Sequence, residues 1–186
     1  MSARTSPPAG RLEQRAADVE ATVGRISARL NDIPVTEMVL LRLMVMLGRE
    51  ISALLEQVLR PHDLNQSDFR SLMILFSQPD GVAHPSELCT SVAQSPANMT
   101  RVADSLNQRG LITRVASEED RRRTILRITP AGEALVRALL PQTAAYTKAL
   151  FEPIPAAARK QLLGQLQALL AQLDHSALPA AASEPP

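Results

Sequence analysis

The sequence predicts a mainly α-helical protein with one small β-hairpin. Of its 186 residues, 45% are apolar and only 2% are aromatic, and Leu and Ala are abundant. This composition favours helix over sheet. Apolar residues recur at three- and four-residue spacing along most of the chain, which is the period of an amphipathic helix. Two short segments, residues 111–115 and 124–128, are predicted to be strands instead.

The bulk properties predict one soluble, cytoplasmic domain. The formal net charge is +1, although the stretch from Arg101 to Arg127 holds seven Arg against four acids and forms a modest basic patch. Cys89 is the only cysteine, so no intramolecular disulfide can form, which agrees with a reducing cytoplasm. The N-terminus has no apolar signal core, and no uncharged apolar run is long enough to span a membrane. We therefore expect no membrane partner.

Both ends of the chain are rich in Pro, Ala and Ser, and we expect disordered tails over residues 1–10 and 176–186. Residues 11–31 are predicted to form an additional N-terminal helix with an apolar stripe. Two placements of this helix stay open at this point. It packs either on its own domain or in a subunit interface.

Residues 36–60 and 130–174 are predicted to be helical, and we assign them to a dimerisation region. The apolar stripe of residues 36–60 is wider than one neighbouring helix needs. Pro141 is expected to kink the second region, whose last helix carries six leucines. Because this apolar surface exceeds what the small middle domain can cover, a homodimer is the economical arrangement.

The middle of the chain, residues 62–129, has capping and turn residues at the positions that a helix-turn-helix requires. His84 and the following residues open one short helix. Ser95 is a good N-cap for a second helix, Pro96 suits its first position, and Gly110 suits the left-handed position after its end. Two helices followed by a two-stranded basic ribbon form a winged helix-turn-helix, which places one helix in the major groove of double-stranded DNA.

The N-terminal end of the second helix supplies candidate DNA contacts. Met99, Val102, Ala103 and Leu106 make one buried face, which leaves the other residues free to bond base edges and phosphates. The predicted DNA-binding residues of the two helices are Ser86, Ser95, Pro96, Asn98, Met99, Thr100 and Arg101.

The loop between the two strands is expected to enter a neighbouring minor groove. It contains Asp120, Arg121, Arg122 and Arg123. The Asp120 carboxylate lies two residues before Arg122, so it could brace that guanidinium and hold it extended. Three arginines in a loop are often only solvated, but here they follow a recognition helix directly, which favours DNA contact.

These segments resemble the DNA-binding core of the MarR family of bacterial regulators. The similar stretch runs from PSEL through SPANMTRVADSLNQRGLITRV to EDRRRTILRITPAG, of which the DRR wing and LRITPAG are the most specific parts. Further similarity extends over roughly residues 33–174 to the EmrR/MprA-like branch of multidrug-efflux repressors. It rests on Ile33, Pro34, Glu37, Leu40, Arg42, Leu43, Leu140, Pro141, Gln172, Leu173 and Asp174.

The resemblance implies a homodimer that represses an efflux operon from a pseudo-palindromic operator. It also implies that small lipophilic or phenolic ligands, such as an aromatic weak acid, release the protein from DNA. The family's Asp-x-Arg wing motif makes Arg122 the expected minor-groove probe, with Arg121 and Arg123 serving phosphates.

The ligand pocket of this branch usually lies between the dimer helices and the winged domain. The resemblance places Met46, Arg49, Phe69 and Met73 on the matching surfaces. Met and Phe would form an adaptable apolar wall, and Arg49 could neutralise a carboxylate or phenolate. The alternative is that both methionines belong to the core and that Arg49 forms an ordinary ion pair.

No catalytic, metal or cofactor motif is found in the sequence, and we expect no enzyme. His62, His84 and His175 are far apart and lack metal-ligand spacing. Cys89 is expected to be a small core residue, as free cysteines usually are. The alternative function is a winged-helix protein–protein interaction module that does not read DNA.

Overall fold

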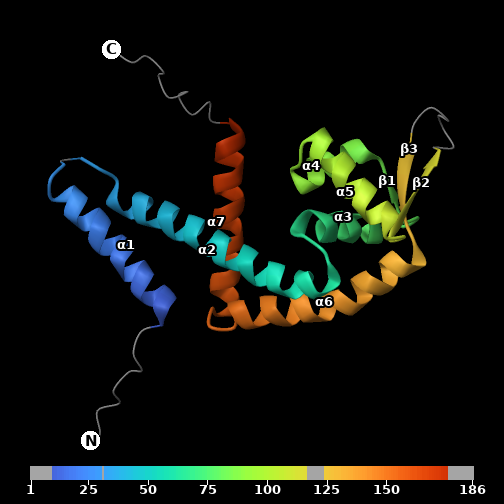
Figure 1. Ribbon diagram of the computed structural model, residues 1–186. Helices are drawn as coiled ribbons and strands as arrows, with labels where there is room; N and C mark the ends of the chain where they lie inside the picture. Colours follow the sequence, from blue (N-terminus) through green and yellow to red (C-terminus); the bar gives the residue numbers. More distant parts are fainter. Residues whose placement is uncertain (1–9, 31, 117–123, 176–186) are drawn as a thin grey trace, which may run out of the picture. The chain divides into compact units, whose positions relative to one another are not determined.

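The computed structural model of the protein describes residues 10–30, 32–116 and 124–175. These residues form seven α-helices, one 3₁₀ helix and one small sheet (Figure 1). The predicted fold class, mainly α with a winged helix-turn-helix, is confirmed. The chain divides into two compact units, residues 1–133 and 134–186, with the boundary inside helix α6. None of the helices in the described ranges is long and apolar enough to cross a membrane.

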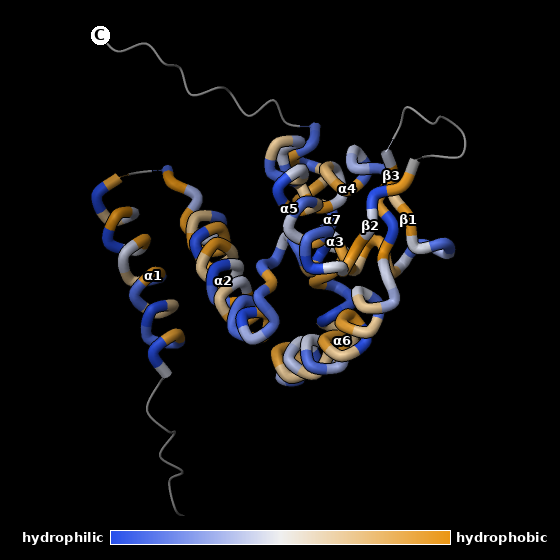
Figure 2. Tube along the Cα trace, turned by 45° about the vertical axis from the view of Figure 1, so that its right-hand side comes forward, coloured by the Kyte–Doolittle hydropathy of each residue, from blue (hydrophilic) through white to orange (hydrophobic). Residues whose placement is uncertain are grey.

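Two helices open the first unit. Helix α1 covers Arg11–Ser27 and packs against α2, Val35–Leu59, of the same chain, with the Val23 side chain fully buried. Figure 2 shows hydrophobic segments recurring between hydrophilic ones along both helices, as an amphipathic pattern requires. Helix α1 ends at Ser27, before the predicted residue 31, and continues as a turn in which the Arg29 and Leu30 N–H groups donate to the Ile26 carbonyl.

Helix α2 ends one residue earlier than predicted, at Leu59. The 3₁₀ helix η1, Arg60–His62, follows it, and Pro61 lies inside this turn. Asp63 then reverses the chain with φ 51°. Helix α3, Gln66–Ser77, begins with the capping box of Asn65 and Asp68, in which each side chain accepts a hydrogen bond from the other residue's backbone N–H.

The winged domain combines three helices with the sheet. Its further elements are β1 (Val82–Ala83), α4 (Pro85–Val92), α5 (Pro96–Gln108), β2 (Ile112–Ala116) and β3 (Thr124–Ile128). The sheet is antiparallel in the order β1-β3-β2, with Ile112 opposite Ile128 and Val82 opposite Arg127. Strand β1 was not predicted, since two residues after the Asp80-Gly81 turn are too short to show an alternating pattern.

The core of this domain lies between α3, α4, α5 and the sheet. The four residues predicted to form the inner face of α5 are all buried. They meet large buried side chains from the neighbouring elements, which are Leu72, Leu75, Leu88, Ile112 and Leu126. This packing fixes α5 between the first helix of the pair and the β-hairpin.

The second unit consists of most of α6, Pro130–Phe151, and all of α7, Ala156–His175. Helix α6 runs through Pro141 as one element. None of the described residues of α7 is buried, and five of its leucines are exposed. Helix α7 therefore presents an apolar surface that this chain does not cover.

The start of α6 is tied closely to the end of α5. The Thr129 hydroxyl donates to the Gly110 carbonyl at 2.7 Å and accepts from the Gly132 N–H at 3.1 Å. The backbone approach is so close that a Cβ on Gly132 would lie 2.2 Å from the Leu111 carbonyl oxygen. Only glycine fits at this position.

We expect Gly132→Ala to destabilise the protein, because backbone atoms must move to admit the methyl group. Overpacking of this kind costs about 1–3 kcal/mol, and sometimes more. Gly24→Ala is the matched control. No atom lies within 4 Å of a Cβ added there, so it should stabilise the protein by about 0.4–1 kcal/mol. Urea unfolding measures both; equal midpoints would contradict the packing described here.

Candidate nucleic-acid interface

Helix α5 begins after a residue in the left-handed conformation, Ala93, and is capped by Ser95. Ala93 takes φ 54° and ends α4. The Ser95 hydroxyl then accepts a hydrogen bond from the Asn98 N–H at 3.3 Å, and Pro96 occupies the first helical position. Ser95 and Pro96, both predicted DNA contacts, thus have a structural role in starting the helix.

The polar side chains in the first turns of α5 differ in whether they are already hydrogen-bonded within the chain. The Asn98 amide donates to the Gln94 side chain, and the Thr100 hydroxyl donates to the Pro96 carbonyl at 3.0 Å. Arg101 is exposed and makes no hydrogen bond or ion pair with a described residue. Met99 is 1% exposed and belongs to the core, so its side chain is not available to a base edge in this structure.

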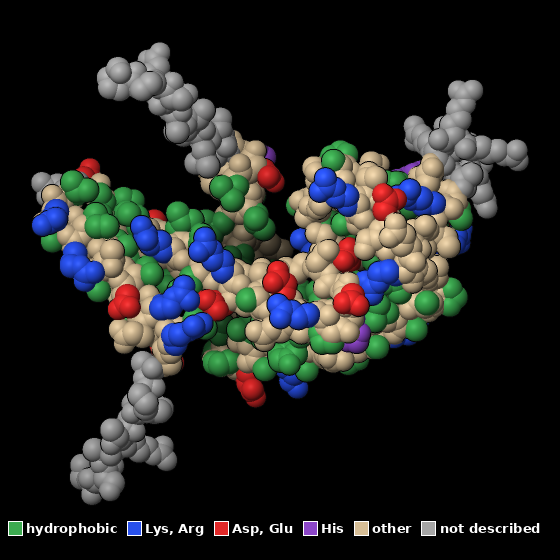
Figure 3. Space-filling view, viewed as in Figure 1, with side chains coloured by type: hydrophobic (Ala, Val, Ile, Leu, Met, Phe, Trp, Pro, Cys, Tyr) green, Lys and Arg blue, Asp and Glu red, His purple; other side chains and the backbone are tan. Residues whose placement is uncertain are grey.

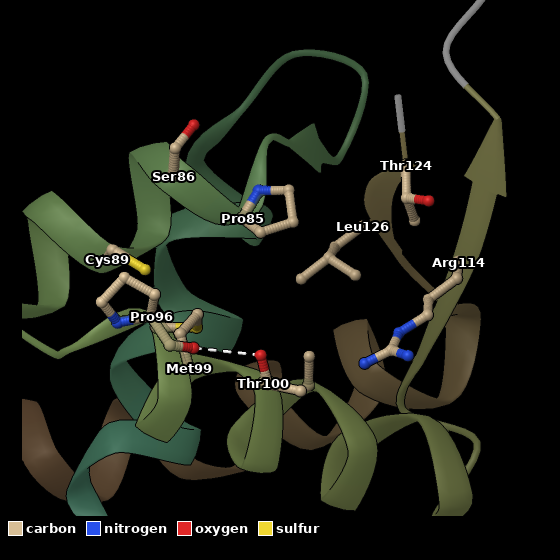
Figure 4. A pocket seen from close by; sticks show the side chains of 10 residues that line it. Pro85, Ser86, Cys89, Pro96, Met99, Thr100, Arg114, Thr124 and Leu126 are labelled. Atoms are coloured by element: carbon tan, nitrogen blue, oxygen red, sulfur yellow. Dashed lines mark hydrogen bonds between the residues drawn. The ribbon is translucent and has the colours of Figure 1, made fainter. Parts of the chain in front are cut away.

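A cavity of about 470 Å³ lies between α4, α5 and the β-hairpin (Figure 4). It brings together four of the predicted contact residues, Ser86, Pro96, Met99 and Thr100. Cys89 lines the same cavity and is half-buried, so it is not the enclosed core residue expected from the sequence. Arg114 of β2 and Leu126 of β3 form the opposite wall.

An ion pair joins the hairpin to α5. The Arg114 Nη2 atom lies 2.6 Å from the Asp104 Oδ1 atom, and both side chains are nearly half exposed. Such a pair contributes little to stability in water, and it connects the base of the hairpin to the helix. Sequence analysis missed it, although opposite charges on either side of Gly110 were the available signal.

The tip of the wing lies outside the described residues. This segment includes Asp120, Arg121, Arg122 and Arg123. The strands on either side of it are paired up to Ala116 and Thr124. The hairpin therefore carries the arginine-rich segment on a base that the Arg114–Asp104 pair connects to α5.

A second arginine connects the C-terminal end of α5 to a distant turn. The Arg109 guanidinium donates to the carbonyl oxygens of His62 and Asp63, both at 2.6 Å. These bonds connect the C-terminal end of α5 to the turn that follows α2. Sequence analysis missed this contact too, since the partners are backbone atoms more than forty residues away.

Asp68 is buried close to this connection. Its Oδ2 atom accepts from the Asn65 N–H at 3.1 Å, while Oδ1 has no partner among the described residues. Burial raises the pKa of the Asp68 carboxyl, and the Asn65 hydrogen bonds and the Arg109 charge oppose that rise.

The four predicted ligand residues differ in their surroundings. Met46 and Arg49 lie in a groove between α1 and α2, whereas neither Phe69 nor Met73 lines that groove. Phe69 is 6% exposed and part of the core, and Met73 is half-buried on α3.

The comparisons with known proteins agree with this architecture. The sequence model of the MarR family matches residues 64–124. The transcriptional repressor MprA of Escherichia coli K12 is 31% identical over 148 residues, which are 80% of this chain and 84% of that protein.

Two solved structures are similar in fold. One is AbsC, a MarR family transcriptional regulator from Streptomyces coelicolor, with a TM-score of 0.72 and 22% identity over 79% of this chain and 100% of that one. The other is BpsR from Bordetella bronchiseptica, whose DNA binding is regulated by 6-hydroxynicotinic acid, with a TM-score of 0.61 and 22% identity over 73% and 92% of the two chains. Since the identity to MprA extends over four-fifths of a chain with winged helix-turn-helix geometry, the protein belongs to the MarR family of transcriptional regulators.

Proposed function

We propose that the protein represses transcription, most specifically of a multidrug efflux operon, by binding a pseudo-palindromic operator as a homodimer. The observation that carries this proposal is the way α5 is held in the domain. Its N-terminal turns carry exposed polar residues, and its C-terminal half is held by Arg109 and by the Arg114–Asp104 pair. A recognition helix needs such fixed placement to enter a major groove. The efflux target rests on the resemblance to the multidrug branch of the family.

Uncovered apolar faces support the homodimer. Five leucines of helix α7 are exposed by 40% or more, and α2 carries a separate exposed apolar face. The α7 residues are Leu163, Leu166, Leu169, Leu170 and Leu173, and those of α2 are Leu40, Leu41, Met44, Val45, Leu47 and Ile51. Apolar surface of this extent is typical of an interface. A two-fold dimer would present two recognition helices about one DNA turn apart.

The proposed DNA contacts divide into two groups. On the helices, Ser86, Asn98, Thr100 and Arg101 are the side chains we assign to the DNA, while Ser95 and Pro96 fix the helix start and offer backbone. In the wing, we assign Arg122 to the minor groove and its neighbours Arg121 and Arg123 to phosphates, with Asp120 bracing Arg122.

Arg122→Ala should strongly weaken operator binding without unfolding the protein. Loss of this cation should also reduce the slope of log affinity against log salt, by about one unit for each phosphate that the variant no longer neutralises. Fluorescence anisotropy over a salt series measures both effects. Arg29→Ala is the control, because it removes the same charge from an exposed position just after the end of α1.

Unchanged binding by the Arg122 variant at every salt concentration would show that the wing assignment is wrong. If the wild-type protein binds no DNA with salt-sensitive affinity but does bind a protein partner, the interaction-module alternative would replace the present proposal.

Arg101→Ala should change the preference among operator variants. Arg101 is exposed and unpaired among the described residues, and a guanidinium that bonds a guanine bidentately contributes about 1–3 kcal/mol of discrimination. A panel of single base-pair substitutions tests this. We expect the variant to lose its preference at one position of each half-site. A uniform loss over the whole panel would place Arg101 on the phosphate backbone.

We further propose that a lipophilic weak acid, with salicylate as the first probe, releases the protein from its operator. BpsR offers a parallel, since its DNA binding responds to an aromatic acid. The physical requirement is that the ligand prefers a conformation whose recognition helices do not fit the operator. A tenfold loss of DNA affinity requires about 1.4 kcal/mol of coupling between the two sites.

Because coupling is reciprocal, operator DNA must weaken ligand binding by the same factor that the ligand weakens DNA binding. Calorimetry with and without a saturating operator duplex measures the first factor, and a DNA-release titration measures the second. We expect the two factors to agree. Equal ligand affinity in both calorimetric experiments would exclude release by this mechanism, even for a compound that binds tightly.

A further inference from the structure

One acidic side chain is buried near the C-terminal end of the recognition helix α5. Figure 3 shows other Asp and Glu side chains on the surface over α1 and α2, among the cations. Asp68 of α3 is instead only 3% exposed, and its Oδ1 atom has no hydrogen-bond partner among the described residues. A buried carboxylate costs free energy unless charges or hydrogen bonds compensate it. A residue that is kept at such a cost is a candidate for a functional role.

Capping of α3 explains only part of this side chain. The Asp68 Oδ2 atom accepts from the Asn65 N–H at 3.1 Å, and the Asn65 side chain accepts from the Asp68 N–H at 3.0 Å. This reciprocal pair needs one acceptor oxygen from residue 68 and no negative charge, so an amide side chain would complete it as well. The charge of Asp68 therefore needs a different partner.

The charge that acts on the Asp68 carboxyl is that of Arg109, which opposes the rise in the Asp68 pKa that burial causes. Arg109 itself forms no ion pair with a described residue. The elements packed on α3 carry other charged or titratable groups, but the pKa of Asp68 does not respond to them. They are Glu56 of α2, His62 and Asp63 of the following turn, Glu87 and Cys89 of α4, Arg101 and Asp104 of α5, and Arg127 of β3.

Arg109 and Asp68 hold the same turn from two sides. The Arg109 guanidinium donates to the consecutive carbonyls of His62 and Asp63, both at 2.6 Å. Two residues later, the Asn65 N–H donates to Asp68. Both acceptors of Arg109 are neutral, so the negative charge of Asp68 is what distinguishes this position from any other pair of carbonyls in water.

We propose that the ionised Asp68 is a positioning residue for operator binding, whose negative charge keeps the Arg109 guanidinium on the turn and thereby fixes the C-terminal end of α5. Without this charge the guanidinium exchanges its two carbonyls for water more readily. DNA binding must then order the end of the helix, which costs conformational entropy and lowers affinity. This role rests on the proposed function.

The role predicts opposite effects on stability and on DNA affinity. Burial is the largest influence on Asp68 and raises its pKa, so the ionised carboxylate lowers the free energy of unfolding at neutral pH. The neutral amide of Asp68→Asn should therefore leave the protein at least as stable as the wild type. The same change should weaken operator binding. A residue with a purely structural role would lower both quantities or neither.

The test uses the full chain and the duplex that the wild-type protein selects from a random-sequence pool. At neutral pH, fluorescence anisotropy should show Asp68→Asn binding this duplex about threefold more weakly, the order expected for one partly screened charge pair. Its urea midpoint should be equal to or above that of the wild type. The direction is informative, because removing an acid should otherwise favour binding to a polyanion.

Glu13→Gln is the matched control. The Glu13 carboxylate also accepts the backbone N–H that precedes its helix, from Gly10 at 2.8 Å, but it is exposed on α1. This variant loses the same charge from the same position of a helix, with no buried carboxylate involved. It should bind the duplex no more weakly than the wild type does.

Two further measurements connect the effect to Arg109 and to ionisation. In an Arg109→Gln background, Asp68→Asn should cause no further loss, because the guanidinium on which the charge acts is gone. The ratio of wild-type to Asp68→Asn affinity should also fall towards one as the pH is lowered, because the wild-type carboxyl then becomes neutral as well. Taking this ratio cancels the titration of the other groups.

The proposal is overturned if Asp68→Asn binds as tightly as the wild type, or if it loses stability and affinity together. It is also overturned if the loss is the same in the Arg109→Gln background, or if the affinity ratio does not change with pH. A wild-type protein that selects no duplex and binds no DNA would refute the proposed function and this role with it. That result is distinct from normal binding by the Asp68 variant, which refutes the role alone.

Discussion

The placement of the recognition helix depends on the two hydrogen bonds of Arg109. The chain reverses between α2 and α3 through a 3₁₀ turn and a left-handed Asp63, and the carbonyls of His62 and Asp63 accept hydrogen bonds from the Arg109 side chain. Arg109 satisfies both, with the charged donors that form the stronger kind of hydrogen bond. Removing its guanidinium would free two backbone acceptors and the C-terminal end of α5 at once.

Asp68 lies near Arg109, and its titration makes the stability of the fold depend on pH. Because burial raises the pKa of the Asp68 carboxyl above its ordinary value, the folded protein binds this proton more tightly than the unfolded chain does. The associated stabilisation is complete below the unfolded pKa and is lost as the pH rises through the raised pKa. At neutral pH the buried Asp68 carboxylate therefore lowers the free energy of unfolding. The hydrogen bond from the Asn65 N–H and the nearby Arg109 charge reduce this loss.

Local signals in the sequence predicted the parts of the fold that short-range chemistry decides. Ser95, Pro96 and Gly110 mark the ends of α5 because caps and positive φ depend on neighbouring residues alone. Its buried face followed from helical spacing. The contacts of Arg109 and Arg114 could not be predicted in this way, since each joins segments that only the tertiary fold brings together. Strand β1 exists only because β3 offers it a partner.

The predicted ligand residues were grouped by the family resemblance and not by local chemistry. Met46 and Arg49 share a face of α2 and line the groove between α1 and α2. Their grouping with Phe69 and Met73 in one ligand site stays a prediction. The resemblance carried little information about α1, because it began near residue 33 and α1 ends at Ser27.

Helix α2 has two chemically different faces, one apolar and one carrying the exposed Arg42 and Arg49. Its apolar face gains stability by leaving water, a non-directional effect that suits a broad interface with a second chain. Its cationic face keeps exposed guanidinium groups, whose value depends on the geometry of the partner and which suit a small anion. A second chain seated on the apolar face would act on a helix that is followed directly by the turn bonded to Arg109 of α5. We therefore expect dimerisation to bear on the spacing of the recognition helices.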